Sequence, residues 1–147
     1  MIYVADTNFT LRFAHRSDPQ HSIVRSAARK LRKDGNEINI IPQTCVEFWN
    51  VITRPVARNG FGFSVAKADH SLGLIERIFP FLPDDSRIYQ EWRKLVVDFG
   101  VSGVQVHDAR IVAAMKTHGV MHILTFNAAD FTRYASFGIV AVDPGTV

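Results

Sequence analysis

Short apolar runs that alternate with amphipathic stretches constrain the fold of this chain more than any other feature. Apolar runs of strand length occur at residues 2–5, 38–41, 121–126 and 139–142, and the first is continuous, as in strands buried on both faces. Between them lie stretches with helical periodicity or propensity, at residues 22–33, 44–53, 64–78, 88–98 and 107–115. The alternation predicts βαβ units and a mainly parallel sheet with helices on both faces.

Length and composition set the scale of this fold. The chain has 147 residues, 47% of them hydrophobic, which is enough for one core, so we expect a single domain over residues 1–147. No apolar run approaches the roughly 18 to 20 residues that a membrane-spanning helix needs. The apolar start, Met1 to Ala5, is too short for a signal peptide, and the single cysteine excludes an internal disulfide. We therefore expect a soluble cytoplasmic protein with no membrane association.

Four acidic residues stand where an α/β sheet builds its binding site. Asp6 directly follows the first predicted strand, and Glu47 follows the end of the second by about a turn and a half of helix. Asp108 lies in the first turn of a predicted helix, and Asp130 follows the third strand within a short helix that begins at Asn127. Because the carboxyl ends of parallel strands meet at one edge of a sheet, we expect the four carboxylates to converge there.

A cluster of carboxylates has a specific chemical use. Carboxylates that lie close together repel one another and raise one another's pKa, and a divalent cation removes that cost. Hard oxygen ligands with room for water suit Mg²⁺ or Mn²⁺, which activate water and stabilise the charge of a phosphodiester transition state. The net charge of +3 fits a polyanionic substrate without requiring one.

Each acid also has a purely structural interpretation. Asp6 could be an N-cap or an Asx-turn residue, and Asn127 with Asp130 resembles a capping box with Asp in place of Glu. Asp108 in a first helical turn complements the helix dipole, and Glu47 could be a solvated helix residue. These interpretations do not explain why the acids recur at the carboxyl side of successive elements.

Four segments of the chain resemble, in order and spacing, the four motifs of PIN-domain nucleases. The segments are Val4-Ala5-Asp6-Thr7-Asn8, Val46-Glu47-Phe48, Val106-His107-Asp108-Ala109 and Leu124-Thr125-Phe126-Asn127-Ala128-Ala129-Asp130-Phe131. The resemblance covers essentially the whole chain and is greatest to the small VapC-like toxins of bacterial toxin–antitoxin pairs. It implies a PIN-like three-layer sandwich and Mg²⁺-dependent (or Mn²⁺-dependent) endoribonuclease activity, with a catalytic and metal-binding quartet of Asp6, Glu47, Asp108 and Asp130.

The resemblance has further implications for the surroundings of the quartet. Thr7 and Asn127 match polar positions that help to orient acids or waters in the family, with a capping role as the alternative for each. Some members of the family have an acid at the position of Asn127, so the choice between one metal and two stays open.

The likeness to VapC-like toxins also implies partners besides the RNA substrate. We expect a homodimer, silenced by a small cognate antitoxin that lays an amphipathic segment in an apolar groove and offers an arginine to the acidic pocket. The candidate groove residues are Phe9, Phe13, Phe48 and Trp49, with a place in the core as the alternative for each.

Other functions fit the sequence less well or stay open. A phosphoacceptor receiver domain needs an acid after a middle strand, and residues 54–60 have none; a haloacid-dehalogenase phosphatase needs Asp-x-Asp, and Asn8 occupies the third place. A non-catalytic RNA-binding PIN domain would usually lack an acid of the quartet, and none is missing. A housekeeping RNA-processing nuclease without antitoxin remains an alternative, which the gene neighbourhood would distinguish from a toxin.

Overall fold

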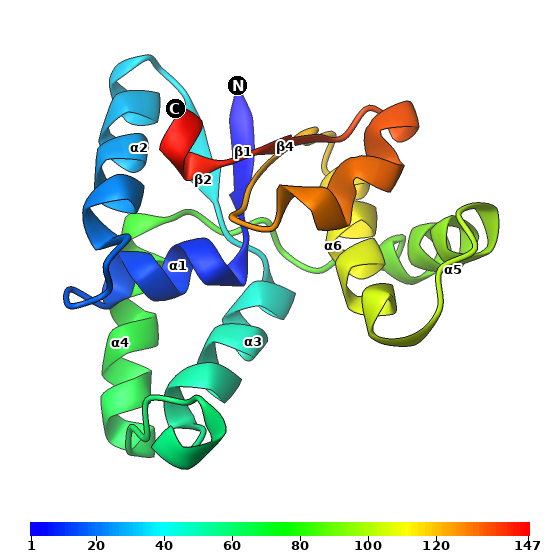
Figure 1. Ribbon diagram of the computed structural model, residues 1–147. Coiled ribbons are helices and arrows are strands. Elements are labelled where there is room, and N and C mark those ends of the chain that lie inside the picture. Colours follow the sequence, from blue (N-terminus) through cyan, green and yellow to red (C-terminus); the bar gives the residue numbers. More distant parts are fainter.

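The computed structural model describes residues 1–147, and at its centre lies a sheet of four parallel strands (Figure 1). The strands are β1 (Ile2–Ala5), β2 (Glu37–Asn39), β3 (His122–Leu124) and β4 (Val140–Val142), in the spatial order β2-β1-β3-β4. β1 is central: its Val4 pairs with Asn39 of β2 and with Ile123 of β3. The predicted parallel sheet is confirmed, and β1, the first strand in the sequence, is hydrogen-bonded to β3, which comes much later in the sequence.

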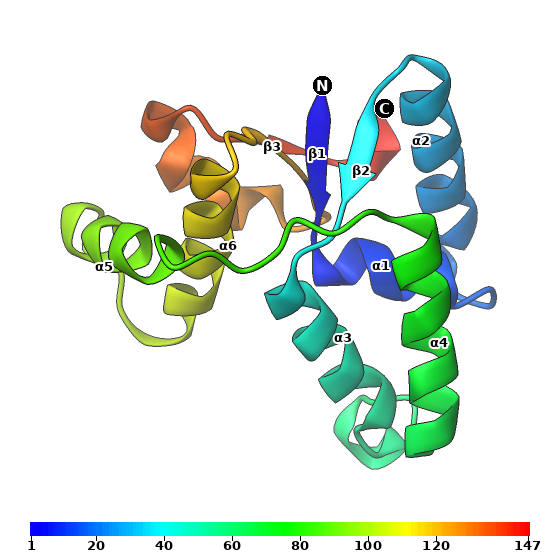
Figure 2. The same cartoon turned by 180° about the vertical axis from the view of Figure 1, so that it is seen from behind.

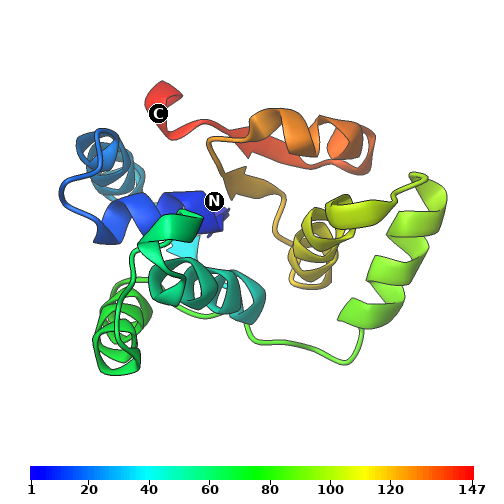
Figure 3. The same cartoon turned by 60° about the horizontal axis from the view of Figure 1, so that its bottom comes forward.

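Six α-helices flank the sheet in two groups. Helices α1 to α4 gather on one side, and α5 and α6 lie on the other with the 3-10 segment η3 (Figures 1 and 3). Their bounds are α1 (Thr7–Ala14), α2 (His21–Lys33), α3 (Pro42–Thr53), α4 (Val65–Ile78), α5 (Ile88–Asp98) and α6 (Val106–Thr117). The 3-10 segments are η1 (Val56–Arg58), η2 (Gly103–Gln105), η3 (Ala128–Phe137) and η4 (Pro144–Thr146). No helix of the protein combines the length and the apolar character needed to cross a membrane.

The two faces of the sheet bury two separate hydrophobic cores. Successive residues of a strand point to opposite faces, so Tyr3 and Ala5 pack with α1 to α4, whereas Val4 packs with α5, α6 and η3. All three side chains are buried. This arrangement explains the continuous apolar run at the start of the chain and confirms the predicted helices on both faces.

Helix α1 is the main element absent from the sequence prediction, in which residues 6–8 were a polar break after the first strand. Asp6 caps the helix instead, because its Oδ1 accepts a hydrogen bond from the Thr7 backbone N–H at 2.8 Å. The helix then buries Phe9 and Phe13. The prediction that Phe9 and Phe48 line an antitoxin groove is wrong, because they are 0% and 1% exposed and belong to the core.

Three strands are shorter than predicted, and some of the residues beyond their ends make contacts outside the strands. Residues 38–41 were predicted as a strand, but β2 ends at Asn39, and Ile40 forms an isolated parallel bridge with Phe81. β3 ends at Leu124 rather than at residue 126, which frees Thr125 and Phe126 to turn toward the start of α1. The short strands thus release polar groups at the carboxyl edge of the sheet.

Candidate active site

The four acids predicted from the sequence all lie at the carboxyl edge of the sheet. Asp6 follows β1, and Glu47 stands in the second turn of α3, the helix that begins just beyond β2 (Figure 2). Asp108 lies in the first turn of α6 and Asp130 in the first turn of η3. Asp6 is buried, Glu47 and Asp108 are partly buried, and Asp130 is exposed, so the group extends from the sheet to the surface.

Asp6 is held by three hydrogen bonds. Its Oδ1 accepts from the Thr7 N–H, while its Oδ2 accepts from the Thr125 hydroxyl at 2.8 Å and from Asn8 Nδ2 at 3.2 Å. Only 7% of the residue is exposed. The carboxylate therefore has a fixed orientation at the junction of β1, β3 and α1.

Asn8 and Thr125 extend this network across the edge of the sheet. Asn8 Nδ2 also lies 3.3 Å from the Thr125 hydroxyl oxygen, and Asn8 Oδ1 accepts from the Phe126 N–H at 3.2 Å. The Thr125 hydroxyl in turn accepts from the Asn127 N–H at 3.0 Å. Sequence reasoning assigned no role to Asn8 or Thr125, although both lie within the motif segments and flank predicted acids.

Glu47 is fixed through both of its carboxylate oxygens. The Thr7 hydroxyl donates to Oε2 at 2.7 Å, and Gln43 Nε2 donates to Oε1 at 3.1 Å. Gln43 was not among the predicted residues, because only the helical fold of α3 brings it one turn before Glu47. Thr7 thus joins two acids of the quartet: its backbone binds Asp6 and its side chain binds Glu47.

The side chain of Asn127 makes no hydrogen bond in the structure, in contrast to Thr7. It is exposed and does not cap η3, so the capping-box alternative for Asn127 and Asp130 is wrong. Its backbone carbonyl accepts from the Asp130 N–H at 3.0 Å, which begins the 3-10 turn. Only the backbone of Asn127 therefore takes part in the network at the edge.

The carboxylates of the quartet repel one another. Burial raises the pKa of Asp6, and the charges of Glu47 and Asp130 add to the rise, against the lowering effect of the bonds from Thr125 and the Thr7 N–H. Burial also raises the pKa of Asp108 to about 6, helped by the charges of Asp6, Asp130 and Glu47. Every member of the quartet thus contributes to one electrostatic cluster.

This cluster fits a hard divalent cation by its chemistry. All four groups offer carboxylate oxygens, and burial together with the charges of the other acids disfavours the ionised forms of Asp6 and Asp108, a cost that a bound cation would offset. No group of three or more His, Cys, Asp or Glu side chains is gathered closely enough to hold a metal ion by itself. Mg²⁺ in proteins commonly keeps several waters and binds only one or two carboxylates directly.

Several known structures with the same fold are VapBC structures, and one of them, VapBC-5 from Mycobacterium tuberculosis, is described as a member of the VapBC family of toxin–antitoxin systems. VapBC2 from Rickettsia felis, bound to a DNA fragment from its promoter, superposes with a TM-score of 0.70 at 12% identity, over 97% of this chain and 98% of the matched chain. VapBC-1 from nontypeable Haemophilus influenzae superposes with a TM-score of 0.69 at 17% identity, over 98% of both chains. No protein-family model and no curated protein matches the sequence.

These likenesses establish the fold: the chain has the α/β fold of VapC-type structures, as the resemblance to PIN-domain nucleases implied. One structure of this fold has a stated activity. Mycobacterium tuberculosis VapC20, described as a sarcin-ricin loop cleaving toxin, superposes with a TM-score of 0.64 at 16% identity, over 97% of this chain and 98% of that one.

Proposed function

We propose that the protein is a metal-dependent endoribonuclease whose Asp6, Glu47, Asp108 and Asp130 bind Mg²⁺ or Mn²⁺ and act on RNA phosphodiester bonds. The observation that supports this proposal most strongly is the gathering of the four acids at the edge where parallel α/β sheets bind ligands, where burial and the charges of the other acids raise the pKa of Asp6 and of Asp108. The fold shared with an RNA-cleaving toxin supports the choice of substrate.

The residues of the quartet have different tasks in the proposed mechanism. Asp6 and Asp108 would hold the ion, Asp6 with an orientation fixed by Thr125 and the Thr7 N–H. Glu47, fixed through both oxygens, would bind the ion through a water that it also orients toward the phosphorus, and the exposed Asp130 would bind the ion in the same way from the solvent side. When bound, the ion supplies Lewis-acid charge and a water of lowered pKa.

The decisive test removes one charge at a time without changing the size of the side chain. Asp6→Asn and Asp108→Asn should each lower metal-dependent cleavage of single-stranded or loop RNA at least about a hundredfold, as expected for loss of a main electrostatic contributor. Asp69→Asn, on the exposed surface of α4, is the matched control and should leave cleavage unchanged. Undiminished cleavage by the Asp108→Asn protein, or full activity in excess EDTA, would contradict the proposal.

We further propose that the protein is the toxin of a toxin–antitoxin pair, forms a homodimer and is inhibited by a small cognate antitoxin. VapBC structures of the same fold support this partner. A groove of about 270 Å³ between α1, α2 and α4 offers an apolar floor that includes Phe13, Leu74 and Ile78, with Arg16 and Arg25 beside it. The floor suits the apolar face of an antitoxin segment and the arginines suit acids beside that face.

A further inference from the structure

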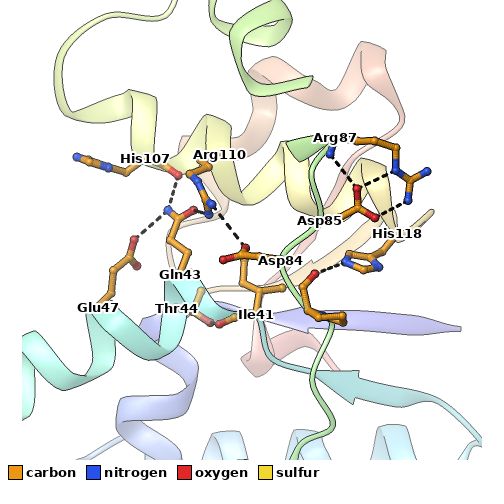
Figure 4. A network of polar contacts seen from close by, with 11 residues as sticks. Ile41, Gln43, Thr44, Glu47, Asp84, Asp85, Arg87, His107, Arg110 and His118 are labelled. Carbon is orange, nitrogen blue, oxygen red and sulfur yellow. Dashed lines mark hydrogen bonds and ion pairs between the residues drawn. The ribbon is translucent and has the colours of Figure 1, made fainter. Parts of the chain in front are cut away.

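We propose that Gln43 is a positioning residue that keeps the Glu47 carboxylate in a fixed relation to the helix that carries Asp108. Gln43 lies on α3, one helical turn before Glu47, and its side chain reaches across to α6 (Figure 4). The inference rests on the proposed function, because it assigns Gln43 a task only if Glu47 and Asp108 act together.

The side-chain amide of Gln43 contacts both helices at once. Its Nε2 donates to Glu47 Oε1 at 3.1 Å and to the backbone carbonyl of His107 at 2.8 Å. Its Oε1 accepts from Arg110 Nη1 at 3.1 Å. His107 directly precedes Asp108, so one amide joins the carboxylate of Glu47 to the first turn of α6 on both sides of Asp108.

The hydrogen-bond partners of the Gln43 amide determine its orientation. Two acceptors, the Glu47 carboxylate and the His107 carbonyl, require the NH₂ group on their side, and the guanidinium of Arg110 requires the oxygen on the other. Arg110 is itself held, because its Nη2 lies 3.5 Å from Asp84 Oδ1. A chain of polar contacts therefore runs from Asp84 through Arg110 and Gln43 to Glu47 (Figure 4).

This bridge spans the two halves of the molecule. α3 packs in the core with α1, α2 and α4, whereas α6 packs in the core with α5. The other oxygen of Glu47 is held by Thr7 from α1, so the carboxylate cannot rotate without losing one of its two donors. Loss of the Gln43 donor would free Glu47 to turn away from Asp108, and small misplacements of catalytic groups cost activity steeply.

A solvent-reachable hollow of about 380 Å³ limits the size of the expected effect. It borders the bridge and is lined by Pro42, Gln43, Val46, Glu47, Asp84, His107 and Arg110. Water can therefore replace part of the lost hydrogen bonding when Gln43 is changed. We expect a partial loss of function rather than the complete loss expected for a member of the quartet.

Two substitutions separate positioning from packing. Gln43→Met keeps the length of the side chain and removes every hydrogen bond. Gln43→Glu keeps the acceptor toward Arg110 but sets a carboxylate against Glu47 and the His107 carbonyl. In Gln43→Glu the favourable effect of an acid in the first turn of a helix opposes the repulsion from Glu47 one turn later, so melting temperatures measure the folding of both variants. Gln90→Met, on the exposed face of α5, is the matched control.

The readouts are the affinity for Mn²⁺, measured by titration calorimetry, and the kinetics of RNA cleavage. Gln43→Met should weaken Mn²⁺ binding about tenfold and lower kcat about tenfold, while KM changes less than about twofold. Gln43→Glu should lower the Mn²⁺ affinity and kcat by at least the same factors. Gln90→Met should match the wild type. If Gln43 acts through Glu47, adding Gln43→Met to Glu47→Gln should change either readout less than about twofold further.

The possible outcomes keep this inference apart from the proposed function. Wild-type Mn²⁺ affinity and cleavage in both Gln43 variants, or full additivity with Glu47→Gln, would overturn the role of Gln43 while the nuclease proposal stood. Wild-type protein that neither bound Mn²⁺ nor cleaved RNA would overturn the nuclease proposal and the inference that rests on it.

Discussion

Asp6 serves the fold and the candidate site with the same two oxygens. One oxygen caps α1 through the Thr7 N–H, and the other receives the hydroxyl of Thr125. The structural interpretation of this acid is therefore confirmed, and the same carboxylate belongs to the candidate site. A capping carboxylate that is buried beside other acids carries an electrostatic cost, which a surface cap would not have.

At the scale of single residues, Asp108 should make the stability of the metal-free protein depend on pH. Its pKa is raised from the ordinary 3.8 to about 6, so the folded protein binds this proton more tightly than the unfolded chain does. The folded state therefore loses stability as the pH rises through about 6 and regains it on acidification. The half-buried position calls for a discounted magnitude, on the order of 1 kcal/mol.

The Asp108→Asn variant isolates this contribution because it cannot titrate. In urea unfolding with EDTA, its stability advantage over the wild type should be about 1 kcal/mol greater at about pH 7.5 than at about pH 4.5. A difference that did not change with pH would show that Asp108 does not carry the raised pKa. Asp69→Asn again serves as the control.

The Thr125 side chain should contribute more to the free energy of unfolding than its small size suggests. It is 0% exposed, and its hydroxyl donates to Asp6 and accepts from the Asn127 N–H. Thr125→Val keeps the shape but removes one of the three hydrogen bonds to Asp6 and the acceptor of the Asn127 N–H, at a cost of about 1–3 kcal/mol in the free energy of unfolding. Thr125→Ser retains the hydroxyl and should lose much less in the same urea titration. Equal stability of the Val and Ser proteins would contradict the assignment.

At the scale of elements, the sequence predicted the regular helices well and missed the helix at the site. α5 and α6 lie close to their predicted bounds because their periodicity or propensity is strong over several turns. α1 was missed because Asp6, Thr7 and Asn8 look like a loop when only local polarity is considered. Their pairing with Glu47 and Thr125 depends on residues 40 and 117 or more positions away, which no local pattern contains.

The residues of the candidate site, too, were only partly predictable from the sequence. Its acids were predictable, because each follows an element that could be recognised along the chain. Gln43 and Arg110 were not, because their roles arise only where α3 meets α6.

Helix α6 should tolerate less change than any exposed helix, because it is covered on most sides. Residues 111–115 are all buried in succession, and Ala113 is 0% exposed. Ala113→Leu should therefore overpack the core and cost about 1–3 kcal/mol of unfolding free energy. Ala66→Leu makes the same change on the exposed surface of α4 and should stay within about 0.5 kcal/mol of the wild type. Urea unfolding compares the two, and an unaffected Ala113→Leu protein would mean that α6 is less tightly packed.

At the scale of the whole molecule, the proposed toxin function predicts an effect on living cells. Induction of the chain alone in a bacterial host should arrest growth, the Asp6→Asn form should not, and coexpression with the small protein encoded beside it should restore growth. Colony counts and growth curves measure this. Unaffected growth with abundant wild-type protein that cleaves RNA in vitro would favour the housekeeping nuclease instead.

The pairing of β1 with β3 has a consequence for the synthesis of the protein on the ribosome. The first acid of the quartet stands at residue 6, and the backbone and side chain of Asp6 are held by Leu124 and Thr125. A nascent chain therefore cannot assemble the carboxylate cluster until Leu124 and Thr125 have been translated and have left the exit tunnel. If the protein cuts RNA as proposed, its own message and the ribosome that reads it face an incomplete enzyme until β3 has emerged and paired with β1.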